Sequence, residues 1–160
     1  MKYQNNPYNI RRYKTNRWFG SIASCRDKFE SFSRLEYGVR AFFLCLRYYY
    51  VNLHLRAISP IIMRFAPPSE NNVHNYIEYV CRKFEENVPL FHCSGERAFY
   101  EITTKQEIFV LARAMALFES GTLISDDVFE KVWTFYHIGT PKFPFDPKYD
   151  ICTYPPPPSG

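Results

Sequence analysis

The residue best placed to take part in acid–base chemistry is Glu119. It lies in the last turn of the apolar stretch KQEIFVLARAMALFESG, which spans residues 105–121. Apolar side chains recur around nearly the whole circumference of a helix there, which predicts a helix buried in the middle of the fold. Apolar neighbours and the negative end of the helix dipole both disfavour an anion. The position therefore indicates either a carboxyl group that reaches solvent or one that holds its proton and can act as a general acid.

A second carboxylate is less well defined. Glu36 and Glu70 are candidates, but the sequence offers each a structural role. Ser33 and Glu36 have the spacing of a capping box at the start of a helix, and Glu70 falls in the first turn of a helix that Ser69 would cap. Chemistry that needs two acids therefore has no clear second partner, whereas chemistry that needs one acid remains open.

Aromatic and cationic side chains could recognise a ligand beside these acids. The chain contains 13 Tyr, 15 Phe and 2 Trp. Tyr8, Trp18 and Tyr37 could stack on sugar rings, or they could pack in the core instead. Arg11 and Arg40 could hold carboxylates of a ligand, although the spacing also lets Arg40 pair with a glutamate on the same helix face.

Other kinds of site have little support in the sequence. The histidines and the 5 cysteines show no metal-ligand spacing and no CxxC pair, so we expect no metal site, no disulfide framework and no cofactor. The net charge is +4, and the many basic residues before Arg64 stand against only Asp27, Glu30 and Glu36, which suits an anionic partner such as nucleic acid, a cell-wall polymer or a membrane surface. Nucleic acid is the weakest of these interpretations because no recognised binding motif accompanies the mixed Arg and Tyr residues.

The elements that must position these residues are mainly helices. The hydrophobic pattern predicts helices over residues 35–55, 60–65, 70–84, 105–121 and 126–136, with a short helical turn near residues 96–100. For the central helix, Thr103 or Thr104 can cap the start and Gly121 can end it.

The regions outside these helices are predicted to be irregular. Residues 3–32 contain turn formers, and we expect a small β-hairpin made by residues 18–22 and 28–33. The proline-rich residues 139–160 predict a surface tail after a single domain of residues 1–138. The first residues lack the apolar core of a signal peptide, and no apolar run is long enough to span a bilayer, so we expect synthesis in the cytoplasm.

Three motifs occur together in a specific order. They are NNPYNIR from residue 5 with a following Trp-x-Gly, FSRLEYGVRA from residue 32, and RFAPPSENN from residue 64. With the Glu-Ser-Gly end of the apolar helix, they resemble the small lysozyme-like proteins of phages and gut-bacterial prophages that are described as structural or virion proteins. The resemblance covers approximately residues 5–121. Tyr8 and Val73 depart from it, since the family has a small residue and a threonine there.

This resemblance implies a lysozyme-like helical domain that cleaves the glycan strands of peptidoglycan, with Glu119 as the single general acid. It adds the motif residues Asn6, Asn9, Asn71 and Tyr76 to the candidate substrate-binding residues. A weaker likeness connects NNPYNIR and Trp-x-Gly to cell-wall glucosaminidases, in which the glutamate helix precedes that segment, so the present arrangement would be circularly permuted. The alternative is a non-catalytic virion or cell-wall-binding protein with the same fold, acting in a virion or at the bacterial wall with peptidoglycan or other virion proteins as partners.

Overall fold

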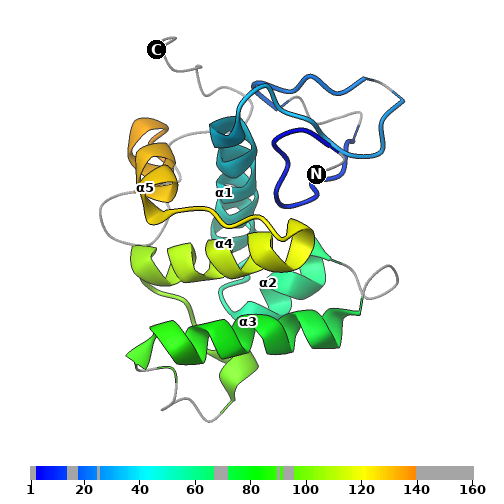
Figure 1. Ribbon diagram of the computed structural model, residues 1–160. Helices are drawn as coiled ribbons and strands as arrows, with labels where there is room; N and C mark the ends of the chain where they lie inside the picture. Colours follow the sequence, from blue (N-terminus) through cyan, green and yellow to red (C-terminus); the bar gives the residue numbers. More distant parts are fainter. Residues whose placement is uncertain are drawn as a thin grey trace.

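The structure, a computed structural model, describes residues 3–13, 18–24, 26–66, 72–89, 91 and 96–139. Its elements in chain order are α1 (Leu35–Val51), α2 (Ile58–Phe65), α3 (Val73–Asn87), the 3-10 helix η2 (Arg97–Phe99), α4 (Lys105–Ser120) and α5 (Asp126–Phe135), shown in Figure 1. The predicted mainly α class is confirmed. The predicted proline-rich tail lies, apart from Gly139, outside the described residues.

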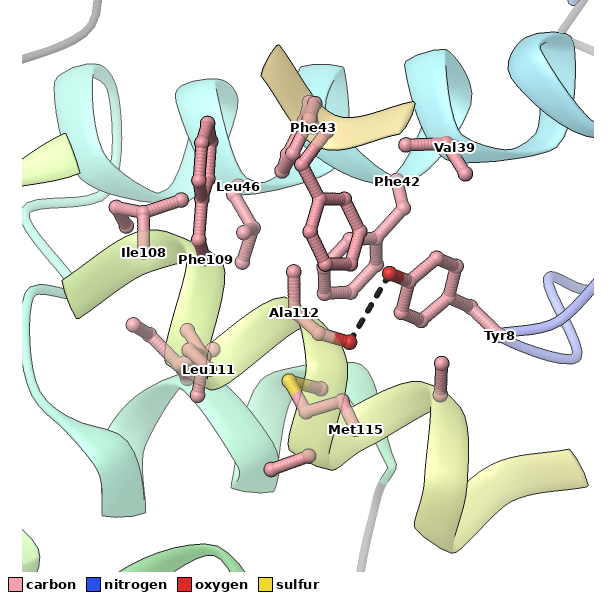
Figure 2. Close-up of a cluster of buried hydrophobic side chains, with 14 of the residues drawn as sticks. Tyr8, Val39, Phe42, Phe43, Leu46, Ile108, Phe109, Leu111, Ala112 and Met115 are labelled. Carbon is pink, nitrogen blue, oxygen red and sulfur yellow. Dashed lines mark hydrogen bonds between the residues drawn. The ribbon is translucent and has the colours of Figure 1, made fainter. Parts of the chain in front are cut away.

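The centre of the fold is α4, which lies between α3 on one side and α1 with α5 on the other (Figure 1). Its residues from Glu107 to Ala116 are buried except for the partly exposed Arg113. Phe109 contacts Phe43 of α1, with ring centroids 6.1 Å apart (Figure 2), and Phe129 of α5, with ring centroids 5.5 Å apart. The predicted burial of this helix is therefore confirmed for its middle, whereas Gln106 at its start and Phe118 in its last turn are exposed.

Local signals set both ends of α4. The Thr104 side chain accepts a hydrogen bond from the backbone N–H of Glu107, and the Glu107 carboxylate accepts one from the backbone N–H of Thr104. At the other end, Gly121 adopts the left-handed conformation with φ 70°, which glycine reaches without steric cost. The capping box and the glycine stop predicted from the sequence are both confirmed.

The start of α1 differs from the prediction. Its N-cap is Arg34 and no side chain caps it, so the predicted capping box of Ser33 with Glu36 is wrong. Glu36 instead forms an ion pair with Arg34, with Nε and Oε2 3.5 Å apart. The helix also ends at Val51, short of the predicted residue 55. No glycine or proline follows Val51 directly, so the sequence pattern did not predict this end.

The start of α3 is also later than predicted. Asn72 is its N-cap, and its side chain accepts a hydrogen bond from the backbone N–H of Asn75 at 3.3 Å. The predicted cap by Ser69 is therefore wrong, as is the placement of Glu70 in the first turn of this helix, which begins at Val73. Asparagine and serine are nearly equivalent N-caps, so the sequence alone could not rank the two positions. Glu70 and Asn71 themselves lie outside the described residues.

The region before α1 is irregular, and its backbone pairs in two short stretches. Residues 10–12 pair with residues 28–30, and residues 20–22 pair with residues 31–33, through antiparallel bridges Arg11 to Phe29 and Ser21 to Phe32. The predicted pairing of residues 18–22 with 28–33 is thus present, but within the described residues it stays at isolated bridges and does not extend into a regular hairpin.

Among the described residues, no helix is both long and apolar enough to cross a bilayer.

Candidate functional site

Glu119 lies where a loop of residues 5–9, the 5–9 loop, contacts the end of α4. The Asn9 side-chain amide donates to the backbone oxygen of Glu119 at 2.8 Å and to its carboxyl Oε1 at 3.2 Å. The Ser120 hydroxyl donates to the carbonyl of Pro7 at 2.7 Å. Further along the helix, the Tyr8 hydroxyl donates to the carbonyl of Ala112 at 3.0 Å (Figure 2). The loop is therefore attached to α4 along more than two helical turns.

Asparagines hold the 5–9 loop in its shape. Asn5 and Asn9 have φ values of 54° and 51°, a left-handed conformation that asparagine tolerates better than most residues. The fully buried Asn6 donates to the carbonyls of Ile10 and Glu30 and accepts from the N–H of Ile10. The Asn5 amide donates to the carbonyl of Phe32 at 3.0 Å. The local sequence NNPYN thus folds as a self-bonded turn that presents Tyr8 and Asn9 to α4.

The Glu119 carboxyl is partly buried, and burial raises its pKa. The Tyr76 hydroxyl and the Asn9 amide, which face the carboxyl, favour the anion and partly offset this rise in pKa. Tyr76 itself is buried on α3, and burial together with the neighbouring Glu119 charge raises the pKa of its phenol well above the usual value. The Tyr76 hydroxyl interacts with the carboxyl without a hydrogen bond of good geometry. The site thus holds one carboxyl group that takes up a proton more readily than an exposed glutamate does.

An aromatic surface adjoins this carboxyl. Phe118 is 39% exposed and stacks on Tyr76, with ring centroids 4.1 Å apart, while Tyr79 contacts the same ring at 5.5 Å. Phe118 was not among the predicted site residues because its place in an apolar helix indicated core packing. The sequence also assigned no role to Ser120, although it belongs to the Glu-Ser-Gly motif.

Several predicted substrate-binding side chains lie inside the protein. Tyr8 is 0% exposed and stacks on Phe42, with centroids 3.7 Å apart (Figure 2). Trp18 is 6% exposed in the same core, and Asn6 is 0% exposed. Packing therefore accounts for both rings, and neither presents a face on which a sugar could stack in this structure.

The remaining candidates lie at other places. Arg40 is buried in α1 with its guanidinium group over the ring of Tyr136. Tyr37 is partly buried and meets Phe19 edge to face at 5.0 Å. Arg11 is exposed, with its guanidinium group over Phe29. Among the predicted site residues that the structure describes, Glu119, Asn9, Tyr76 and Tyr8 are therefore brought together, whereas Glu36 belongs to the start of α1.

The chain is similar to a known phage protein over part of its length. The chain is similar to Protein P5 of Pseudoalteromonas phage PM2, with 39% identity over 82 residues that cover 49% of this chain and 51% of Protein P5. The chain thus spans about half the length of this curated relative. No protein-family model matches the sequence. The predicted resemblance to phage proteins is confirmed in its coarser form, as similarity to a phage protein.

Proposed function

We propose that this chain is a non-enzymatic phage protein that serves as a structural component of the virion. The observation that carries the proposal is that the side chains of the NNPYN motif are engaged inside the protein. Asn6 and Tyr8 are buried, and Asn9 is bonded to the end of α4, so the residues that define the resemblance stabilise the fold. The similarity to a protein of phage PM2 supports the same assignment.

In this proposal Glu119 is a structural residue. Its backbone carbonyl is one of the last in α4 and has no partner within the helix, so the Asn9 amide satisfies it. The Glu119 carboxyl oxygen Oε1 accepts a second hydrogen bond from the same Asn9 amide, and the two bonds together fix the orientation of the 5–9 loop. A glutamine at this position would keep an acceptor for the Asn9 amide, so the structural role does not require the acid.

A second function is favoured by the raised pKa of Glu119. A carboxyl with a raised pKa next to an exposed aromatic ring is suited to protonate the leaving oxygen of a glycosidic bond. In this candidate function the chain cleaves peptidoglycan glycan strands, and the acid contributes roughly two to four orders of magnitude to the rate. Phe118 would then supply the ring beside the sugar, in place of the buried Tyr8 and Trp18.

One pair of measurements separates the two functions. Purified protein is incubated with bacterial sacculi, and soluble muropeptides are identified by mass spectrometry. In parallel, phage particles purified from a producing culture are analysed for the protein. The structural proposal predicts that the protein co-purifies with particles and releases no soluble fragments. Retention of the protein on intact sacculi, without particles, would assign it to wall binding instead.

The deciding variants are Glu119→Gln and Glu86→Gln. Glu86 is an acid on α3 whose side chain is 61% exposed, so it controls for the loss of one negative charge. Release of muropeptides by the wild type and by Glu86→Gln, with loss of release in Glu119→Gln, would refute the structural proposal and establish Glu119 as the general acid.

A further inference from the structure

Two aromatic side chains are accessible to solvent where the end of α4 packs against α3. They are Phe118 of α4 and Tyr79 of α3, and we call this pair the aromatic surface. The centroids of the two rings are 5.5 Å apart and their planes are inclined at 52°. Helices α3 and α4 lie side by side (Figure 1), so the two rings form one continuous apolar area.

The aromatic surface is held in place before any ligand binds. Phe118 stacks on the buried Tyr76, with ring centroids 4.1 Å apart. The Lys83 ammonium group lies 5.5 Å from the centroid of the Tyr79 ring. A ligand therefore meets rings that are already ordered, which lowers the entropic cost of binding. Solvent-accessible aromatic rings on a rigid support are the surfaces that recognise proline-rich segments in the polyproline II conformation.

The chain itself contains a segment of that chemistry. Residues 154–158 read Tyr-Pro-Pro-Pro-Pro and lie outside the described residues. Each proline ring fixes its own φ angle, so a run of four prolines favours the polyproline II conformation. Such a segment loses little conformational freedom on binding, and its ring faces are apolar enough to pack on Phe118 and Tyr79.

The start of the tail lies close enough for these prolines to reach the aromatic surface. Gly139 packs on Trp133, because a Cβ at Gly139 would lie 2.5 Å from Cζ2 of that ring. Trp133 contacts Phe109 of α4, with ring centroids 5.8 Å apart, and Phe118 follows along the same helix. At about 1.5 Å per residue of helix, the path from Gly139 to Phe118 is roughly 25 Å. The residues from Gly139 to Pro155 span about 50 Å at ~3.1 Å per residue, which is ample.

We propose that residues 154–158 bind the aromatic surface of their own chain, with proline rings packed on Phe118 and Tyr79. A ligand joined to its site through the same chain has an effective concentration of about a millimolar, so a weak contact is sufficient. The bound segment covers the ring beside Glu119 and would exclude a sugar there. The proposed virion role does not depend on this contact.

The test is photo-crosslinking in the full chain. Phe118→p-benzoylphenylalanine keeps an aromatic ring at position 118 and bonds to adjacent C–H groups under ultraviolet light. After digestion with trypsin, mass spectrometry should find residue 118 joined to the peptide of residues 149–160, which follows Lys148. The product should have the mass of one chain, and its yield should not change with protein concentration.

The matched control is Phe99→p-benzoylphenylalanine. Phe99 is also exposed, but it lies on η2, which the ion pair of Arg97 with Glu85 fixes at the other end of α3. This variant should leave residues 149–160 without a crosslink. A chain with Pro155→Ala/Pro156→Ala/Pro157→Ala/Pro158→Ala should lose most of the crosslink from position 118. Added free peptide of residues 149–160 should halve the crosslink yield at about a millimolar.

Four results would overturn the proposal. They are no crosslink between position 118 and residues 149–160, equal crosslinking from positions 99 and 118, an unchanged yield in the chain without the four prolines, and a product with the mass of two chains. The last would assign the aromatic surface to a second copy. Circular dichroism of each variant confirms that the helices are intact.

Discussion

Replacing Gly38 with alanine is expected to destabilise the protein, although alanine is the better helix former. Gly38 lies in the first turns of α1, facing the 5–9 loop. A Cβ at residue 38 would lie 2.1 Å from the carbonyl oxygen of Asn5 and 3.3 Å from Cδ of Pro7. Cβ contacts shorter than 3.0 Å essentially do not occur in proteins, and a backbone carbonyl cannot rotate away as a side chain can. The 5–9 loop must therefore move away from α1 by close to one ångström.

The size of the effect follows from opposing contributions to the free energy of unfolding. Alanine in a helix interior gains about 1 kcal/mol over glycine. Forcing an extra methyl group into a packed site costs about 1–3 kcal/mol, and each hydrogen bond lost from the displaced loop costs about 1 kcal/mol more. If two of the three bonds made by Asn5, Tyr8 and Asn9 are lost, the net loss is about 2–4 kcal/mol.

Thermal unfolding followed by circular dichroism at 222 nm measures this loss, with urea unfolding as the equilibrium counterpart. For a chain of this size, each kcal/mol lowers Tm by about 2–4 °C, so we expect a decrease of about 5–15 °C. Gly121→Ala is the control, because no atom lies within 4 Å of the added methyl group. It should lose only the roughly 1–2 kcal/mol that a left-handed alanine costs.

A double-mutant cycle tests the mechanism. Asn9→Ala removes both hydrogen bonds to Glu119 and puts an alanine in the left-handed conformation, so it should cost about 1–3 kcal/mol in the wild type. In the Gly38→Ala background the loop has already moved, so the same substitution should cost much less. A Gly38→Ala variant as stable as the wild type, or additive losses in the cycle, would show that the contact between the 5–9 loop and α1 is not as tight as the structure has it.

Three further substitutions test the site and the central helix. Tyr8→Phe removes the donor to the Ala112 carbonyl but keeps the stacked ring, so urea unfolding should show a loss of about 1 kcal/mol. Burial raises the pKa of Glu119, so its carboxyl contributes full stability below the pKa of the unfolded chain and loses it as the pH rises through the folded pKa. The Glu119→Gln variant should therefore match the wild type in acid and exceed it in Tm at neutral pH; a lower Tm at neutral pH would contradict the raised pKa. Thr104→Ala removes the N-cap of α4 and should cost about 1–2 kcal/mol, whereas Thr104→Ser should keep most of the stability.

The sequence predicted α4 well because several independent signals agree there. The apolar periodicity, the Thr104 and Glu107 capping pair and the Gly121 stop all indicate the same helix, and each is local in the chain. The end of α1 and the start of α3 were predicted poorly because the local signals there are weak or compete. Val51 is followed by neither glycine nor proline but by Asn52, a weaker stop signal, and two nearly equivalent caps compete before α3.

The site was only partly predictable. The position of Glu119 at the end of an apolar helix was sufficient to predict an acid in an unusual environment, and the raised pKa agrees with that. Burial of loop residues could not be read from the sequence, because Tyr8 has the same local signal whether it faces solvent or Phe42. What decides its place is a contact with α4, at a sequence separation of 104 residues.

That separation also orders events in time. The bonds from the 5–9 loop to α4 join residues 104, 110 and 113 positions apart, so none can form until nearly the whole described chain has been made. At about 5–20 residues per second, the loop leaves the ribosome roughly 5–20 s before its partners do. During that interval the Tyr8 hydroxyl has no Ala112 carbonyl to bind, whereas the Asn6 side chain can already form its hydrogen bonds with the backbone of Ile10. Docking of the first motif onto the last turns of α4 is thus a late step in folding, and the part of α1 around Phe42, on which Tyr8 stacks, stays uncovered until docking is complete.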